Sequence, residues 1–160
     1  MRRVAGIVLA LLLSGGAARA DCDHFKWSLA KEKAWFALSP EPAGAEIAPA
    51  ERAVELALKQ GDAAGFVLPL KKPMGPSEYG GVVHIAALAK AGLYQVTLSN
   101  EAWVDVIQNQ ARARTRNVSR QSDCPAFAKS VRFELAAGPA VLQISGVAAP
   151  KLAFAFTAAP

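Results

Sequence analysis

Hydrophobic residues recur at every second position along most of the chain beyond residue 50. Side chains of a strand point alternately to the two faces of a sheet, so a period of two predicts strands with one buried face. Such runs cover residues 54–58, 66–70, 83–85, 94–98, 103–108, 131–135, 141–144 and 152–156, separated by glycine, proline and polar turn residues. About eight short strands without helices between them predict a mainly β domain over residues 51–160, an antiparallel, jelly-roll-like β-sandwich.

The pattern before residue 51 is different. Residues 24–38 have a narrow apolar stripe at helical spacing, and Ser28 can cap the helix that this stripe predicts. Residues 39–50 contain three prolines and one glycine, so we expect residues 21–50 to form a short N-terminal helix followed by irregular chain. Residues 51–60 also suit a helix, because Ala, Leu, Glu and Lys favour helices, but the alternation in the following run favours a strand.

The first twenty residues are typical of a cleavable secretory signal. Two arginines precede the apolar residues 4–13, and small residues stand at the two positions that a signal peptidase inspects before Asp21. The apolar run is shorter than the ~20 residues that span a bilayer as a helix. We therefore expect residues 1–20 to be removed and the protein to be periplasmic or secreted, with no transmembrane segment.

Removal of the signal changes the charge of the chain. The full sequence has 18 basic and 13 acidic residues and a formal net charge of +5. Three of the basic residues and none of the acidic ones precede Asp21, which leaves 15 against 13 and a net charge of +2. A balance this mild does not indicate a nucleic-acid partner.

Cys22 and Cys124 are the two cysteines of the chain. In an exported protein an even pair predicts a disulfide bond, and closing a loop of this length stabilises the fold by up to ~4.7 kcal/mol in the chain-entropy model. The alternative is a pair of redox-active or nucleophilic thiols, which usually lie close in sequence, as in C-x-x-C.

Four segments of the C-terminal half resemble the β-sandwich domains of the bacterial pre-peptidase C-terminal type. They are residues 91–96 (AGLYQV), 104–106 (VDV), 130–138 (SVRFELAAG) and 142–146 (LQISG). The resemblance covers roughly residues 82–157 and implies a sandwich fold and an accessory, non-catalytic role. It implies no site residues, and the acidic cluster that binds calcium in some members is missing. The whole chain also resembles small exported proteins of proteobacteria.

Trp103 and Asp105 are the first candidate binding residues. If Val104 and Val106 point into the core, Trp103 and Asp105 point outward, and a tryptophan beside an acid on a sheet suits a sugar or peptide ligand. The alternative is that Trp103 packs beneath the N-terminal helix. We expect this second arrangement, because a segment attached at Cys22 must cover something.

Arginines are concentrated in residues 109–128, which we expect to be a long polar loop. Arg112, Arg114, Arg116 and Arg120 fall within nine residues. One interpretation is a solvated hairpin kept soluble by charge. The other is a binding site for an anion or partner, such as a lipid headgroup, a lipopolysaccharide phosphate or an acidic protein, because guanidinium groups match carboxylates and phosphates.

The sequence is poorly equipped for most catalytic chemistry. It has two histidines, His24 and His84, whereas a non-haem iron site uses two histidines and a carboxylate on one face. We predict no cofactor or metal, and an exported protein with an accessory or ligand-binding role in the cell envelope. Its partner is an envelope protein, a glycan or an anionic headgroup. The alternative is a small metal-dependent enzyme, such as a dioxygenase, that uses His84 and acids near Asp105.

Overall fold

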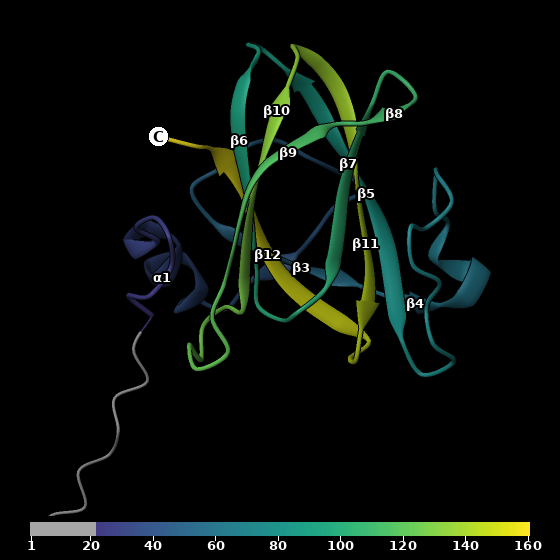
Figure 1. The fold of residues 1–160 in the computed structure, drawn as a ribbon, viewed down its shortest axis with the longest axis horizontal. Helices are drawn as coiled ribbons and strands as arrows, with labels where there is room; N and C mark the ends of the chain where they lie inside the picture. Colours follow the sequence, from purple (N-terminus) through teal and green to yellow (C-terminus); the bar gives the residue numbers. More distant parts are fainter. Residues whose placement is uncertain (1–21) are drawn as a thin grey trace, which may run out of the picture.

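Two β-sheets packed face to face form the body of the computed structural model, which describes residues 22–160 (Figure 1). The predicted signal, residues 1–20, lies outside the described residues. Sheet A contains, in spatial order, β1 (Glu41–Pro42), β3 (Ala53–Ala57), β12 (Lys151–Ala158), β6 (Gly92–Leu98), β10 (Lys129–Leu135) and β9 (Arg114–Arg120). Sheet B contains β2 (Glu46–Ile47), β5 (Tyr79–Leu88), β11 (Gly138–Val147), β7 (Trp103–Gln108) and β8 (Ala111–Arg112), with β4 (Lys59–Gln60) beside β5.

The mainly β, sandwich-type fold predicted from the alternation is confirmed. Seven of the eight predicted strands correspond to β3, β5, β6, β7, β10, β11 and β12. Two parallel pairs, β1 with β3 and β2 with β5, make both sheets mixed, whereas an antiparallel sandwich was predicted. These short edge strands belong to residues 39–50, which were expected to be irregular. Pro42 lies on such an edge, where its missing N–H does not interrupt a ladder.

Residues 66–70 were predicted to form a strand, and this prediction is wrong. After the 3₁₀ helix η1 (Gly61–Ala64), this stretch lies across the outer face of sheet B. The side chain of Gln143 on β11 accepts hydrogen bonds from the N–H groups of Val67 (3.0 Å) and Leu68 (3.2 Å) and donates to the carbonyl oxygen of Leu68 (3.0 Å). The alternation therefore reflects an extended chain lying on a sheet instead of a strand within one.

Residues 109–128 were predicted to be a polar loop, yet they contain β8 and β9. The strand β9 pairs along its length with β10 at the edge of sheet A. It has no apolar alternation over its first half because residues 114–117 are all exposed. Charged residues on an edge strand also protect its free backbone groups from pairing with other chains.

The core lies between the sheets and consists of the inward-facing apolar residues of both. Its largest members are fully buried: Ile85, Leu98, Phe133, Leu135, Leu142, Ile144, Leu152 and Phe154. They come from strands far apart in sequence, so the core forms only when both sheets are assembled.

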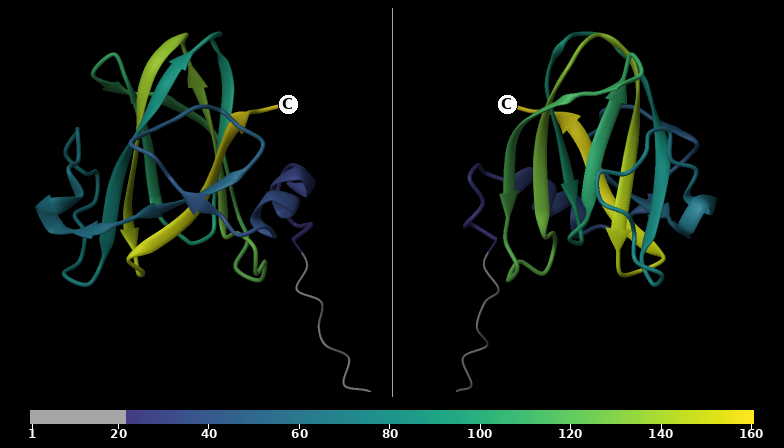
Figure 2. Two further views of the ribbon diagram at one scale, coloured as in Figure 1. Left: turned by 180° about the vertical axis from the view of Figure 1, so that it is seen from behind. Right: turned by 45° about the vertical axis from the view of Figure 1, so that its right-hand side comes forward.

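The N-terminal segment covers the outer face of sheet A, opposite the side where residues 61–74 cover sheet B (Figure 2). Its helix α1 (Ala30–Phe36) is shorter than the predicted 24–38. Two backbone N–H groups of the chain before this helix form hydrogen bonds to side chains on and next to β9. Lys26 N–H donates to Ser119 Oγ at 2.9 Å, and His24 N–H donates to Gln121 Oε1 at 3.2 Å. Ser28 Oγ accepts from the N–H of Ala30 at 3.4 Å, although Leu29 occupies the cap position.

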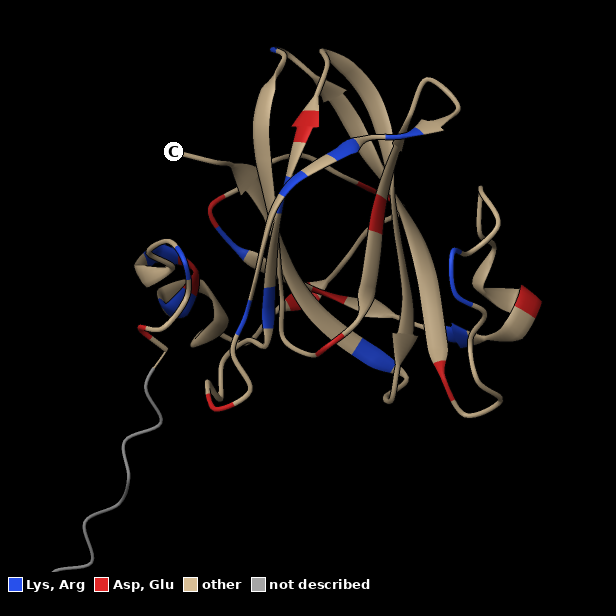
Figure 3. Ribbon diagram, viewed as in Figure 1, with Lys and Arg blue, Asp and Glu red and all other residues tan. Residues whose placement is uncertain are grey.

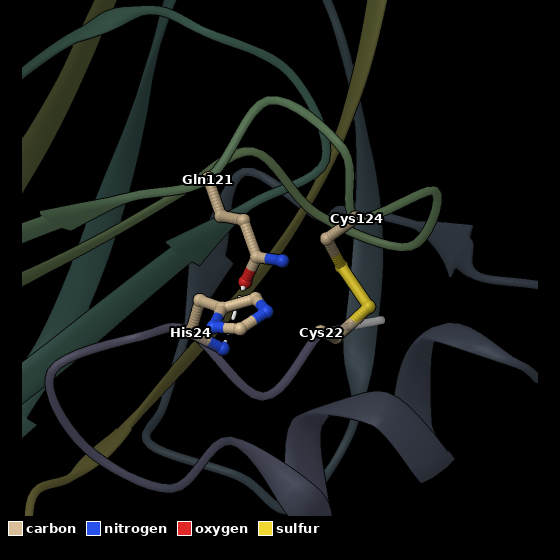
Figure 4. The surroundings of a disulfide bond; sticks show 4 residues. All are labelled: Cys22, His24, Gln121 and Cys124. Atoms are coloured by element: carbon tan, nitrogen blue, oxygen red, sulfur yellow. Dashed lines mark hydrogen bonds between the residues drawn. A yellow bond between two sulfur atoms is a disulfide. The ribbon is translucent and has the colours of Figure 1, made fainter. Parts of the chain in front are cut away.

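The predicted disulfide between Cys22 and Cys124 is present, with its two Cα atoms 4.7 Å apart (Figure 4). Beside it, Phe25, Leu29 and Phe127 form a second, smaller hydrophobic cluster that is separate from the core. The rings of Phe25 and Phe127 meet edge to face with their centres 5.2 Å apart. The disulfide bond and this cluster together hold the N-terminal segment on sheet A.

A buried polar network fixes the rest of this segment. Gln95 on β6 donates to a carboxylate oxygen of Glu32 on α1 and accepts from Arg132 Nε at 2.9 Å. The guanidinium carbon of Arg132 lies 4.4 Å from the centre of the Trp27 ring, which is cation–π geometry. Burial raises the pKa of Glu32, while its hydrogen bonds and Arg132 oppose that shift.

In the described part of the chain, no helix has the length and apolar character needed to cross a membrane.

Candidate functional site

One pocket lies where β7 of sheet B faces β9 and β10 of sheet A. Its volume is about 140 Å³. The strand β8 pairs with Ile107 and Gln108 at the end of β7, so the beginning of β7 is left free to line the mouth of this pocket. We call it the Trp103 pocket, and it is lined by Leu70, Lys71, Lys72, Trp103, Val104, Asp105, Thr115, Val118, Arg120, Lys129, Val131 and Ser145.

Trp103 begins β7, and 48% of its surface is exposed. The neighbouring strand makes room for its ring at Gly146, where a Cβ atom would come within 3.0 Å of Trp103 Cδ1. Gly146 also has a φ of +73°, a conformation that glycine adopts without strain. The expectation that Trp103 packs beneath the N-terminal helix is wrong, because that segment covers sheet A and Trp103 belongs to sheet B (Figure 1).

Lys129 is the unexpected member of the site. It lies on the core side of β10, in line with Val131, Phe133 and Leu135, and only 4% of its surface is exposed. Its ammonium group donates a hydrogen bond to the carbonyl oxygen of Ala102. The same group lies 5.5 Å from the centre of the Trp103 ring, so the side chain reaches from sheet A to sheet B across the pocket.

The charge of Lys129 is poorly compensated. Among residues 22–160, no carboxylate oxygen lies within the 4.0 Å of an ion pair with its ammonium group. Burial lowers the pKa of Lys129, and the positive charge of Arg120 lowers it further, while Glu101 and Asp105 act in the opposite direction. A buried cation without a carboxylate partner is destabilising, and groups with such shifted pKa values are concentrated at functional sites.

Asp105, a candidate binding residue from the sequence, lines the pocket, but both of its carboxylate oxygens already contact basic groups. Oδ1 is 3.3 Å from Lys71 Nζ, and Oδ2 accepts a hydrogen bond from Arg112 Nε at 3.0 Å. Arg112 also donates to the carbonyl oxygen of Pro69. Asp105 therefore connects β7 and β8 to the segment that forms one wall of the pocket.

The predicted arginine site is not brought together. Arg112 lies in sheet B, whereas Arg114 and Arg116 lie in sheet A, and Figure 3 shows the basic residues spread along β9. Arg116 pairs with Glu134 at 2.6 Å, and Arg120 pairs with Glu101 at 3.5 Å. Of the four arginines, Arg120 is the one that lines the Trp103 pocket.

The residues of the predicted metal-dependent alternative do not meet either. Among residues 22–160, no group of three His, Cys, Asp or Glu side chains is arranged to hold a metal ion. His84 is exposed on β5 and is paired with Val141 of β11, which in turn is paired with Ile107 of β7. His84 is therefore level with Ile107, two residues away from Asp105 along β7. His24 lies in the N-terminal segment on sheet A, beside the disulfide (Figure 4), whereas His84 and Asp105 belong to sheet B.

No protein-family model, curated protein or solved structure matches the chain. The resemblance of residues 82–157 to the pre-peptidase C-terminal type therefore stays a prediction. The fold and the site define a disulfide-bonded β-sandwich with a small, positively charged pocket between the open edges of its two sheets.

Proposed function

We propose that the protein is an exported, non-catalytic β-sandwich with an accessory role in the bacterial envelope, and that it binds an anionic ligand in the Trp103 pocket. The observation that carries this proposal is Lys129, a buried cation that faces the pocket and has no carboxylate partner among residues 22–160. Its ammonium group donates to the carbonyl oxygen of Ala102 and lies over the Trp103 ring. An anion in the pocket supplies the missing counter-charge.

The charges around the pocket support an anion over a cation. Lys71, Lys72, Arg120 and Lys129 line it together with a single carboxylate, that of Asp105. Both oxygens of this carboxylate already contact basic groups. Hydrogen bonds between a protein cation and an anionic ligand are stronger than neutral ones, and partial exclusion of water strengthens them further.

A binding role is favoured over catalysis by the state of the polar groups. A general base must be available to accept a proton, whereas Asp105 is held between Lys71 and Arg112. The accessory role is the one that the resemblance to pre-peptidase C-terminal domains implies. Of the predicted partners, a glycan or an anionic headgroup fits a pocket of about 140 Å³ better than a protein surface does.

A titration with inorganic phosphate tests anion binding in its simplest form. We expect saturable NMR shifts of the Trp103 indole N–H and the Lys129 amide in the processed wild-type protein. Lys129→Met should abolish them, whereas Lys151→Met, which removes an exposed lysine of another strand, should leave them unchanged. Equal shifts in Lys129→Met and wild type, or no saturable shift at the pocket, would exclude the proposed site.

Export is tested separately from binding. The full chain, expressed in a bacterium, should accumulate in the periplasm or medium with an N-terminus near Asp21 and with Cys22 and Cys124 oxidised. An unprocessed chain in the cytoplasm would exclude the exported role.

A further inference from the structure

We infer that the ligand of the Trp103 pocket is a single anionic sugar residue, bound through its ring at Trp103 and through its carboxylate or phosphate at Lys129 and Arg120. This inference rests on the proposed anion-binding function and adds the chemical class of the ligand. A bare anion does not explain an exposed tryptophan at the entrance, and a neutral sugar does not explain a buried ammonium group.

The size of the pocket suits one ring. Its volume of about 140 Å³ is close to the ~150 Å³ of engineered cavities that hold one benzene-sized molecule. An extended peptide or a folded protein surface needs far more room. The ligand therefore inserts one ring-sized unit, while the remainder of any polymer lies outside the pocket.

Trp103 supplies a surface for the ring. A sugar ring presents C–H groups on one face and hydroxyl groups at its edge, and the flat indole of a half-exposed tryptophan matches such a face. The exposed fraction of Trp103, 48%, leaves ring surface available for this contact. The adjacent Gly146 allows the indole to lie against β11, which holds it in place.

Two cations are placed to receive the anionic group. Lys129 has its ammonium group 5.5 Å from the centre of the Trp103 ring, so an anion on a ring stacked there lies within reach. Arg120 lines the same pocket, and its ion pair with Glu101 is long, at 3.5 Å, and exposed on both sides. Exposed pairs of this kind contribute little to stability, so Arg120 can exchange Glu101 for a ligand at small cost.

The remaining lining favours a sugar over an aromatic acid. Ser145 and Thr115, which both carry hydroxyl groups, line the pocket, and the Cα atom of Ser145 is directly opposite that of Trp103. A few convergent polar groups fix the orientation of a polyhydroxylated ligand, whereas an aromatic ring has no partners for them.

The test compares six small probes by NMR titration of the processed protein. Glucuronate combines a sugar ring with a carboxylate; glucose lacks the charge, acetate lacks the ring, and benzoate replaces the sugar by an aromatic ring. Glucose 6-phosphate and inorganic phosphate form a second pair, and the tighter of the two charged sugars tells which anionic group the pocket prefers. We expect a charged sugar to bind about tenfold more tightly than glucose and than its own ring-free anion.

Two variants assign the two contacts. Trp103→Ala should reduce the affinity for the charged sugar to that of acetate or phosphate and leave the latter unchanged, and Trp103→Phe should restore part of the loss. Lys129→Met should abolish binding of every anion. Leu38→Ala, at another exposed apolar position, is the control.

The outcomes separate the two proposals. If acetate, phosphate or benzoate binds as tightly as the charged sugars, the sugar inference is wrong while anion binding stands. If Trp103→Ala leaves the affinity for glucuronate and glucose 6-phosphate unchanged, the sugar inference is also wrong. If no anion shifts the resonances of the pocket, both proposals fall together.

Discussion

The ammonium group of Lys129 lies 5.5 Å from the centre of the Trp103 ring, although the two residues belong to different sheets. Core positions of a strand normally hold apolar residues and not lysine, because burial of an unpaired charge is unfavourable. Here the side chain crosses from β10 toward β7 and meets the aromatic ring at the mouth of a pocket. The buried charge that destabilises the sandwich is therefore the same charge that we propose binds the ligand.

Replacing Lys129 by methionine should stabilise the protein. Methionine has a similar length and no charge to desolvate, and exchanging buried charged groups for apolar ones often stabilises proteins by 1 kcal/mol or more. We expect a gain of about 1 kcal/mol, which raises the Tm by roughly 3 °C in a domain of this size. Differential scanning calorimetry measures it, with Lys151→Met as the control, whose lost surface ion pair with Glu55 changes stability little. A loss of stability in Lys129→Met would show that the cation is structurally required.

The pH dependence of this gain tests its cause. The pKa of Lys129 is lowered in the folded protein from 10.5, its ordinary value. Between the folded and unfolded pKa values the unfolded chain binds more protons, so wild-type stability rises with pH across that window. Lys129→Met lacks this titration, and its advantage in urea unfolding should shrink as the pH approaches 10.5. An advantage that is constant with pH would attribute the gain to packing.

The period of two was sufficient to predict the sandwich because the core strands have one apolar face each. It failed at residues 66–70, where a chain in extended conformation lies on the outer face of sheet B and alternates for that reason. It failed in the opposite sense at β9, an edge strand with charged and polar residues on both faces. Apolar alternation reports which side chains are covered, and it does not report which backbone groups are paired.

The candidate site was only partly predictable for a related reason. Trp103 and Asp105 were identified because both point outward from β7. Lys129 was not, although it stands two residues before Val131 on the core face of the same strand, and that position was itself the signal. The placement of the arginines was not predictable, because the chain crosses from sheet B to sheet A between Arg112 and Arg114, a change that residue spacing does not reveal.

Glu32→Gln should flatten the acid side of the stability profile. Burial raises the pKa of Glu32 above 4.5, its ordinary value, so the folded protein binds more protons than the unfolded chain between the two pKa values. Wild-type stability therefore falls as the pH rises through that window. Glutamine keeps an oxygen that accepts from Gln95 and carries no charge. The free energy of unfolding of the variant, relative to that of wild type, should therefore be higher at pH 7 than at pH 4.

Urea unfolding at the two pH values measures this change. Glu51→Gln is the matched control, because Glu51 is exposed and pairs with Lys31 at 3.4 Å. If Glu32→Gln were more destabilising at pH 7 than at pH 4, attraction between the Glu32 carboxylate and Arg132 would outweigh the burial of the charge.

Gln143→Leu should loosen the segment that forms one wall of the Trp103 pocket. The Gln143 amide makes three hydrogen bonds to Val67 and Leu68, and leucine makes none. Because a lost hydrogen bond contributes about 1 kcal/mol, we expect a moderate global loss and a larger local one. Trypsin should then cut after Lys71 faster than in wild type. Gln108→Leu, which loses bonds to a different loop at Ala136 and Pro139, should not change that cut. Equal nicking in the two variants would mean that Gln143 does not hold the segment.

Replacing both Cys22 and Cys124 by serine should release the N-terminal segment before it affects the sheets. Loss of a native disulfide typically costs 2–5 kcal/mol in small exported domains. The cluster around Phe127 is separate from the core between the sheets, so its loosening leaves the sandwich assembled. In hydrogen exchange we expect the Lys26 amide, which bonds Ser119, to lose protection well beyond the loss at Val131 on β10. Phosphate binding at the Trp103 pocket should persist, because the segment lies on the outer face of sheet A, whereas Lys129 reaches the pocket from the core side of β10. A variant that is unfolded at 25 °C would show instead that the sandwich depends on the disulfide bond.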